Sequence, residues 1–228
     1  MIQEAERFKY WQSNYIVVYP TNNMAKKELQ INESLDETSL AILKSFFPEG
    51  IEKTLNELQE RAKYSHEPMH RTLSSLVKRK ILTARKIGKT VLYKLDMKNW
   101  FAKLAFYHYT IERVRKFSEK YPTLVFAMEK LPRDKIETLI IFGSYAKGNE
   151  TENSDVDILA VSSEKKAVDL EIRALTHSFK MREFHAIVLP RTEFIKIKAE
   201  NKEFWRDLVQ YGIIFKGSDL VYENAYVP

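Results

Sequence analysis

The segment from Ile140 to Asp157 constrains this chain more than any other part of its 228 residues. An apolar run that ends at Phe142 is followed by Gly143-Ser144, a polar stretch, and then Ser154-Asp-Val-Asp157 at the start of a second apolar run. Short apolar runs bounded by turn residues predict buried β-strands. The sequence therefore predicts a Gly-Ser turn at the end of one strand and an Asp-x-Asp pair at the start of the next.

These residue types suit phosphate and metal chemistry. Gly143 has no Cβ, so phosphates can approach its backbone closely, and the Ser144 hydroxyl can donate a hydrogen bond to a phosphate oxygen. Side chains two positions apart on a strand share a face, so Asp155 and Asp157 can hold Mg²⁺ together. A metal held there would neutralise a triphosphate and stabilise an in-line displacement at its α-phosphorus.

The order strand, Gly-Ser, loop, and Asp-x-Asp on the next strand resembles the polymerase β-like nucleotidyltransferase superfamily, especially its small prokaryotic members. The resemblance runs from about residue 138 to 190, with the remaining tail included, and Lys147-Gly148 matches the usual basic-Gly continuation. It implies transfer of a nucleoside monophosphate from a nucleoside triphosphate to a hydroxyl acceptor. The residues it implies are Gly143, Ser144 and Lys147 for the nucleotide, and Asp155 and Asp157 as catalytic residues that bind Mg²⁺ or Mn²⁺.

One expected group is not matched. Active members of the superfamily usually carry a third carboxylate on a later strand, and the matching strand here is predicted at Phe184–Leu189. His185 stands where an aspartate is expected, and Glu183 lies two residues earlier on the same face. Two functions therefore stay open: an active transferase, or a transcriptional regulator whose degenerate transferase domain senses nucleotide or dimerises. A role in a toxin–antitoxin pair is a third possibility, by analogy alone.

The N-terminal part of the chain predicts three helices. Ser34 and Glu37 have the spacing of a capping box, which would start the first helix. A second helix is expected over Ile51–Ala62. A third is expected after Ser65 as its N-cap, because Pro68 fits only in a first turn.

A basic hairpin is expected next. The stretch Ile81–Leu95 predicts two short strands joined by a turn around Gly88. Three helices followed by a hairpin with a basic tip resemble the winged helix-turn-helix of transcriptional regulators, over residues 34–96. In that arrangement the third helix and the hairpin tip face DNA. The expected DNA contacts are His70, Arg71, Ser74, Ser75, Lys78, Arg85, Lys86 and Lys89.

The remaining segments complete the expected architecture. A long helix is expected over Lys98–Glu119, with Trp100, Leu104, Tyr107, Ile111 and Val114 along one side, and a shorter helix near Thr123–Lys130. Strands and helices then alternate to the end of the chain. We therefore expect an α/β (α+β) protein: a winged helix-turn-helix, then a mixed sheet with flanking helices. The expected domains are an N-terminal one over 1–96, linking helices over 97–132 and the nucleotidyltransferase domain over 133–228. Within the first, residues 1–33 have no assigned role, although Tyr15–Tyr19 is expected as a strand.

Composition narrows the partners. A net charge of +6 and a pI of about 9.2 favour a polyanionic partner, with DNA as the expected one beside the nucleotide. The chain has no cysteine, which excludes disulfides and thiol chemistry. It has no apolar run long enough to span a membrane and no signal-peptide pattern at Met1, so we expect a cytoplasmic protein with no membrane association. A homodimer is compatible with winged-helix binding to two half-sites.

Overall fold

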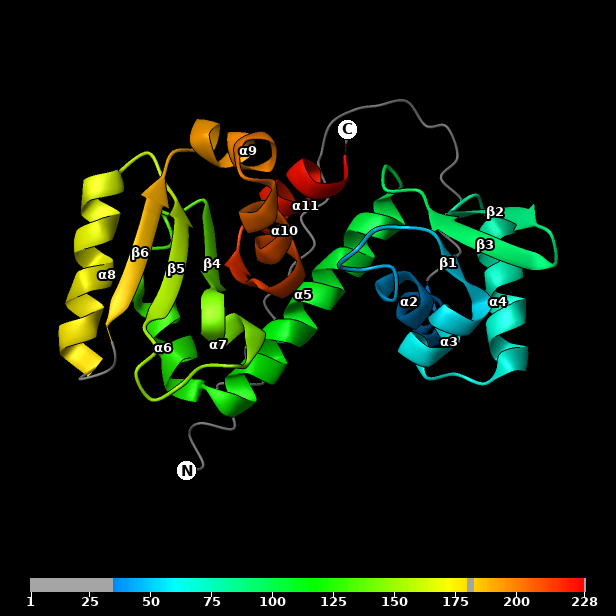
Figure 1. Cartoon of the computed structure of the whole chain (residues 1–228), viewed down its shortest axis with the longest axis horizontal. Helices are drawn as coiled ribbons and strands as arrows, with labels where there is room; N and C mark the ends of the chain where they lie inside the picture. Colours follow the sequence, from blue (N-terminus) through cyan, green and yellow to red (C-terminus); the bar gives the residue numbers. More distant parts are fainter. Residues whose placement is uncertain (1–34, 180–182, 228) are drawn as a thin grey trace. The chain divides into compact units, whose positions relative to one another are not determined.

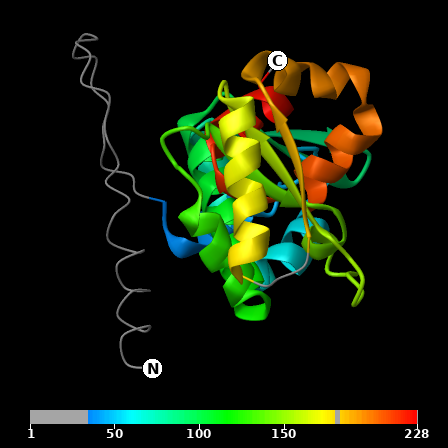
Figure 2. The same cartoon turned by 90° about the vertical axis from the view of Figure 1, so that its left-hand side faces the viewer.

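Figures 1 and 2 show a computed structural model of the protein, which describes residues 35–179 and 183–227. The expected strand Tyr15–Tyr19 and the expected cap Ser34 lie outside the described residues. In chain order the elements are α2 (Glu37–Lys44), β1 (Lys53–Thr54), α3 (Leu55–Ala62), α4 (His66–Lys78), β2 (Leu82–Ile87), β3 (Thr90–Leu95), α5 (Trp100–Lys120), α6 (Pro122–Lys130), β4 (Thr138–Phe142), α7 (Gly143–Lys147), β5 (Val156–Val161), α8 (Lys165–Phe179), β6 (Phe184–Leu189), α9 (Arg191–Glu200), α10 (Lys202–Tyr211), β7 (Ile213–Lys216) and α11 (Ser218–Tyr226).

The first two helices start at other residues than expected. α2 begins after Asp36, whose carboxylate accepts the Ser39 N–H at 2.6 Å, so Asp36 caps this helix. The expected helix from Ile51 begins only at Leu55, because Thr54 and Glu57 form a reciprocal capping box there. The two residues before it form β1, which pairs with β3.

The predicted basic hairpin is confirmed as β2 and β3. The two strands pair antiparallel from Leu82↔Leu95 to Ile87↔Thr90, and Gly88 in the connecting turn has φ +58°. With β1 they form a three-stranded sheet in the order β1-β3-β2. Helices α2, α3 and α4 each bury one face in the core that they share with this sheet. Four residues of these faces are fully buried: Ile42, Leu58, Leu73 and Leu76.

The buried face of α5 differs from the expected stripe. Trp100 is 57% exposed and Ile111 is 39% exposed, whereas the residues that α5 buries are Ala102, Ala105, Phe106, Thr110 and Phe117. Apolar residues lie on several sides of this helix, so its periodicity does not single out one face. The two small alanines let α5 pack closely against its neighbours, which no hydrophobic pattern reveals.

The second sheet confirms the mixed architecture expected for the C-terminal part. Its strand order is β6-β5-β4-β7; β4 is antiparallel to both β5 and β7, and β5 is parallel to β6. Ile141 and Ile158 lie on one face, in a cluster with Val168 and Ile172 of α8, which runs along β6 in Figure 2. The other face carries Ile140, Leu159 and Val161, in a cluster with core residues of α9 and α10: Phe194, Trp205 and Leu208.

The last of the described helices is α11, which begins directly after Gly217. Gly217 adopts φ +73° and caps α11. Tyr226 of this helix donates a hydrogen bond to the Pro48 carbonyl at 2.7 Å, and its ring meets the Phe47 ring with centroids 5.3 Å apart. α11 therefore ties the end of the chain to the segment after α2. None of the described helices is both long and apolar enough to cross a membrane.

Candidate active site

The predicted Gly-Ser turn is the junction of β4 and α7. Gly143 has φ +70°, and a Cβ built on it would lie 2.0 Å from Asp157 Oδ2. Position 143 therefore requires glycine for two reasons, the left-handed backbone and the neighbouring carboxylate. From the sequence, Gly143 was expected only to let phosphates approach its backbone. Its contact with the Asp157 carboxylate was not foreseen.

The Asp-x-Asp pair lies beside that turn. Asp157 is in β5 and pairs with Phe142 across the sheet, which puts its side chain on the face of Leu159 and Val161. Asp155 lies immediately before β5 rather than within it, and it is exposed. The Asp157 side chain is 28% exposed, so both carboxylates are open to solvent and to a ligand.

His185 stands beside Asp157. β5 and β6 are parallel with Asp157 opposite His185, and His185 Nδ1 is 3.2 Å from Asp157 Oδ1. Glu183 precedes β6, and its carbonyl accepts the Val156 N–H at 3.0 Å. The imidazole thus lies next to the Asp-x-Asp pair, on the strand where a third carboxylate was expected.

The two aspartates suit Mg²⁺, which proteins commonly hold through one or two carboxylates plus substrate phosphates. Within residues 35–179 and 183–227, no three His, Asp or Glu side chains are grouped so as to hold an ion by themselves. A metal bound by Asp155 and Asp157 would take its other ligands from a triphosphate and water.

Lys147 is one helical turn from Ser144, on the same side of α7. In this structure its ammonium contacts α10: Lys147 Nζ is 2.6 Å from Asp207 Oδ2 and 5.3 Å from the centre of the Tyr211 ring. The side chains of Lys147 and Asp207 are 35% and 38% exposed. An exposed pair of this kind is weak enough to be exchanged for a phosphate.

Sequence reasoning missed the residues of α10 that face this site. Phe204 meets the Phe142 ring edge-on with centroids 5.3 Å apart, and Asp207 and Tyr211 follow at the next two turns. Their spacing marks one face of a helix. Nothing in that spacing indicates that the face lies against α7, because the packing of distant segments decides it.

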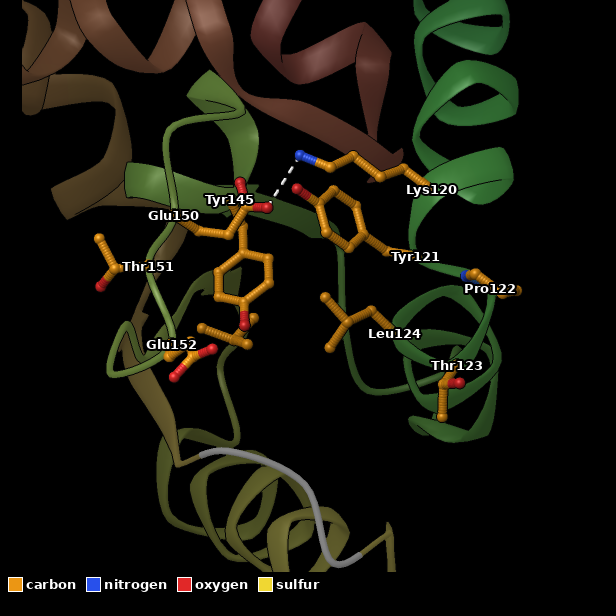
Figure 3. Close-up of a pocket in the computed structure, with 10 residues that line it drawn as sticks. Lys120, Tyr121, Pro122, Thr123, Leu124, Tyr145, Glu150, Thr151 and Glu152 are labelled. Atoms are coloured by element: carbon orange, nitrogen blue, oxygen red, sulfur yellow. Dashed lines mark hydrogen bonds and ion pairs between the residues drawn. The ribbon is translucent and has the colours of Figure 1, made fainter.

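A pocket of about 600 Å³ lies behind the loop that leads to Asp155. Val156 lines it and alternates with the two aspartates, so the pocket is on the opposite side of β5 from Asp157. Figure 3 shows Tyr121 and Tyr145 side by side in its lining, with ring centroids 5.3 Å apart in an edge-on arrangement, and the ion pair between Lys120 and Glu150. The other lining residues are Pro122, Thr123, Leu124, Thr151 and Glu152.

The ion pair at this pocket anchors the loop. Lys120 Nζ donates to Glu150 Oε1 at 2.8 Å, which links the end of α5 to the segment between α7 and β5. The hydrogen bond from Lys120 and then the nearby Tyr121 hydroxyl lower the pKa of Glu150 from 4.5 to about 2. Burial raises the pKa of the Tyr121 hydroxyl. The carboxylate therefore stays ionised through the whole physiological range.

The residues expected to contact DNA are all exposed, on α4 and on the β2–β3 hairpin. Some of them already have partners within the chain. Arg85 pairs with Glu52 (Nε to Oε1, 2.9 Å), and Ser74 donates to the His70 carbonyl at 2.9 Å. The lysines at Lys78, Lys86 and Lys89 extend the exposed basic surface.

Residues 127–220 match the family described as Polymerase beta, Nucleotidyltransferase. A protein of Methanocaldococcus jannaschii with the provisional name protein adenylyltransferase is 37% identical over 54 residues, which are 24% of this chain. The chain spans about half, 48%, of the length of that curated relative. A crystal structure of a provisionally assigned nucleotidyltransferase from Sulfolobus solfataricus is 24% identical, with a TM-score of 0.22, and covers 46% of this chain and 85% of its own. The segment from residue 127 to residue 220, with its Gly-Ser turn and Asp-x-Asp pair, is a polymerase β-type nucleotidyltransferase domain.

Proposed function

We propose that this protein transfers a nucleoside monophosphate from a nucleoside triphosphate to a hydroxyl group. The observation that carries the proposal is the close approach of Gly143 and Asp157, within a segment that matches the nucleotidyltransferase family. The name of the curated relative supports an adenylyl donor, ATP, and a protein as the acceptor.

In the proposed reaction the acceptor oxygen attacks the α-phosphorus. A new P–O bond forms, the bond from that phosphorus to the oxygen bridging to the β-phosphate breaks, and pyrophosphate leaves while the hydroxyl loses its proton. Ser144 and Lys147 would bind the triphosphate, and Asp155 and Asp157 would hold Mg²⁺ or Mn²⁺. When bound, the metal supplies charge stabilisation for the displacement.

The test compares binding and transfer in matched variants. Each of the four nucleoside triphosphates is titrated into the protein in the presence of Mg²⁺, and binding is measured by calorimetry. The wild type should bind, and Asp155→Asn/Asp157→Asn should abolish that binding. Transfer should fall at least about 100-fold in that variant, because a metal contributes several kcal/mol to such a displacement. Asp169→Asn removes an acid of α8 that pairs with Arg173, and it should change neither quantity. Metal-independent nucleotide binding, or none at all, would overturn the proposal.

His185 favours the alternative function, a regulator that binds nucleotide without transferring it. Its imidazole lies 3.2 Å from Asp157 where a carboxylate is expected. Under this alternative the wild type binds nucleotide with magnesium and releases no pyrophosphate with any acceptor. Both functions therefore predict magnesium-dependent nucleotide binding, and only the transferase predicts pyrophosphate release.

We also propose that residues 35–96 form a winged-helix domain that binds DNA, joined by residues 97–132 to the transferase. The order α2-β1-α3-α4-β2-β3 and the three-stranded sheet β1-β3-β2 support it. So do the exposed basic side chains of α4 and the hairpin. Fluorescence anisotropy with duplex DNA across a salt series tests this, and an affinity independent of salt would contradict it.

A further inference from the structure

Tyr211 is an aromatic side chain at the edge of the candidate site that belongs to neither core cluster. It ends α10 and is 36% exposed, although large aromatic rings mostly serve to fill cores. Arg113 of α5 fixes its backbone: this guanidinium donates to the Tyr211 carbonyl, and to the Gln210 carbonyl at 2.8 Å. The ring is thus presented to solvent from a firmly held helix end.

The face of that ring is next to the triphosphate-binding residues. α10 lies against α7, and Lys147 Nζ is 5.3 Å from the ring centre while it pairs with Asp207. Figure 1 shows the two helices side by side at the end of β4. Phosphates that draw Lys147 away from Asp207 would uncover the ring, because the pair is solvated and weak.

We infer that Tyr211 stacks against the nucleobase of the bound triphosphate. The inference rests on the proposed function and adds a residue that recognises the base rather than the phosphates. Lys147 moves from the ring to the phosphates, and the base takes the ring face that the ammonium leaves. Stacking on an aromatic ring accepts any base, so this contact provides affinity with little selection among bases.

The experiment measures binding of two ligands, Mg²⁺-ATP and Mg²⁺-tripolyphosphate, to the full chain. Tyr211→Ala should weaken ATP binding by about 5- to 100-fold, the loss of one base–aromatic stack, and leave tripolyphosphate binding unchanged. Tyr211→Phe keeps the ring and should bind ATP like the wild type. Thermal melting of each variant checks that it is folded.

Phe126→Ala is the matched control. Phe126 is 41% exposed on α6, and Lys130 Nζ lies 4.8 Å from its ring centre, so it repeats the arrangement of an exposed ring under a lysine away from the site. Its removal should leave ATP binding within about twofold of the wild type, as for surface changes in general.

Three results would overturn the inference. If Tyr211→Ala binds ATP like the wild type, Tyr211 does not stack the base, although the proposed function stands. If it weakens ATP and tripolyphosphate equally, Tyr211 acts only by positioning Lys147. If wild-type binding of ATP does not depend on Asp155 and Asp157, the proposed function itself fails and this inference fails with it.

Discussion

The Oδ2 atom of Asp157 lies 2.0 Å from the point where any side chain at position 143 would have its Cβ. Gly143 is also in the left-handed region, at φ +70°. The backbone of the turn and the position of the Asp157 carboxylate therefore both require glycine at position 143. A side chain at this position must strain the backbone and also displace Asp157. The two parts of the motif are therefore one steric unit.

Gly143→Ala should destabilise the fold and also lower metal and nucleotide binding. Gly148→Ala is the matched control, because Gly148 has φ +74° and a Cβ there would meet nothing within 4 Å. Each substitution should cost about 1–2 kcal/mol of unfolding free energy through backbone strain, measured by urea titration. Only Gly143→Ala should weaken Mn²⁺-nucleotide binding, and equal binding by the two variants would contradict the steric argument.

His185→Asp should increase the transfer rate if the missing third carboxylate limits catalysis. His185 Nδ1 is 3.2 Å from Asp157 Oδ1, so a carboxylate at position 185 would lie next to the Asp-x-Asp pair. Pyrophosphate release is the measurement, and an increase of about tenfold or more would correspond to at least 1.4 kcal/mol of barrier lowering. His185→Asn, which cannot supply a charge, is the control. A rate that is unchanged in both variants would show that position 185 does not limit turnover.

The Lys120–Glu150 ion pair should make stability depend on pH at acid values. The folded-state pKa of Glu150 is lowered from 4.5 to about 2, first by the Lys120 hydrogen bond. A lowered pKa gives stabilisation that is complete above pH 4.5 and is lost as the pH falls towards 2. Glu150→Gln should therefore unfold at lower urea than the wild type at pH 7, with the difference shrinking as the pH falls below 4.5. A difference that is the same at pH 7 and at low pH would exclude this ionised pair as its source.

Lys89→Ala should weaken DNA binding and reduce the slope of log affinity against log salt by about 0.9, the value for one phosphate contact. Arg71→Ala should lower affinity in the same assay. Lys165→Ala, which removes an exposed charge from α8, should change neither quantity. If Lys89→Ala and Arg71→Ala bind DNA like the wild type across the salt series, the DNA-binding surface is wrongly placed.

Glu52→Gln should strengthen DNA binding. Glu52 holds Arg85 through two hydrogen bonds, so its neutralisation frees a guanidinium on the hairpin and removes a negative charge beside it. The double variant Glu52→Gln/Arg85→Ala should lose this gain. A gain that persists without Arg85 would assign the effect to the acidic charge alone.

The sequence by itself determined the elements whose signals are local. Alternating and continuous apolar runs placed β4, β5, β6 and the basic hairpin, and the Gly-Ser and Asp-x-Asp residues identified the chemistry that the family match supports. Such patterns work because a strand or hairpin is specified by neighbours in the chain. Helix starts failed at α2 and α3 because competing caps, Asp36 and Thr54, lie within a few residues of the expected ones.

Only the tertiary structure decided which distant residues meet at the site. The contact of Lys147 with Asp207 and Tyr211, the position of His185 beside Asp157, and the burial of Ala102 rather than Trp100 on α5 depend on how separate elements pack. The energies of these contacts come from segments far apart in the chain, so no local pattern encodes them. Gly143 shows the difference most simply: its residue type is visible in the sequence, and the carboxylate that requires it is visible only in the fold.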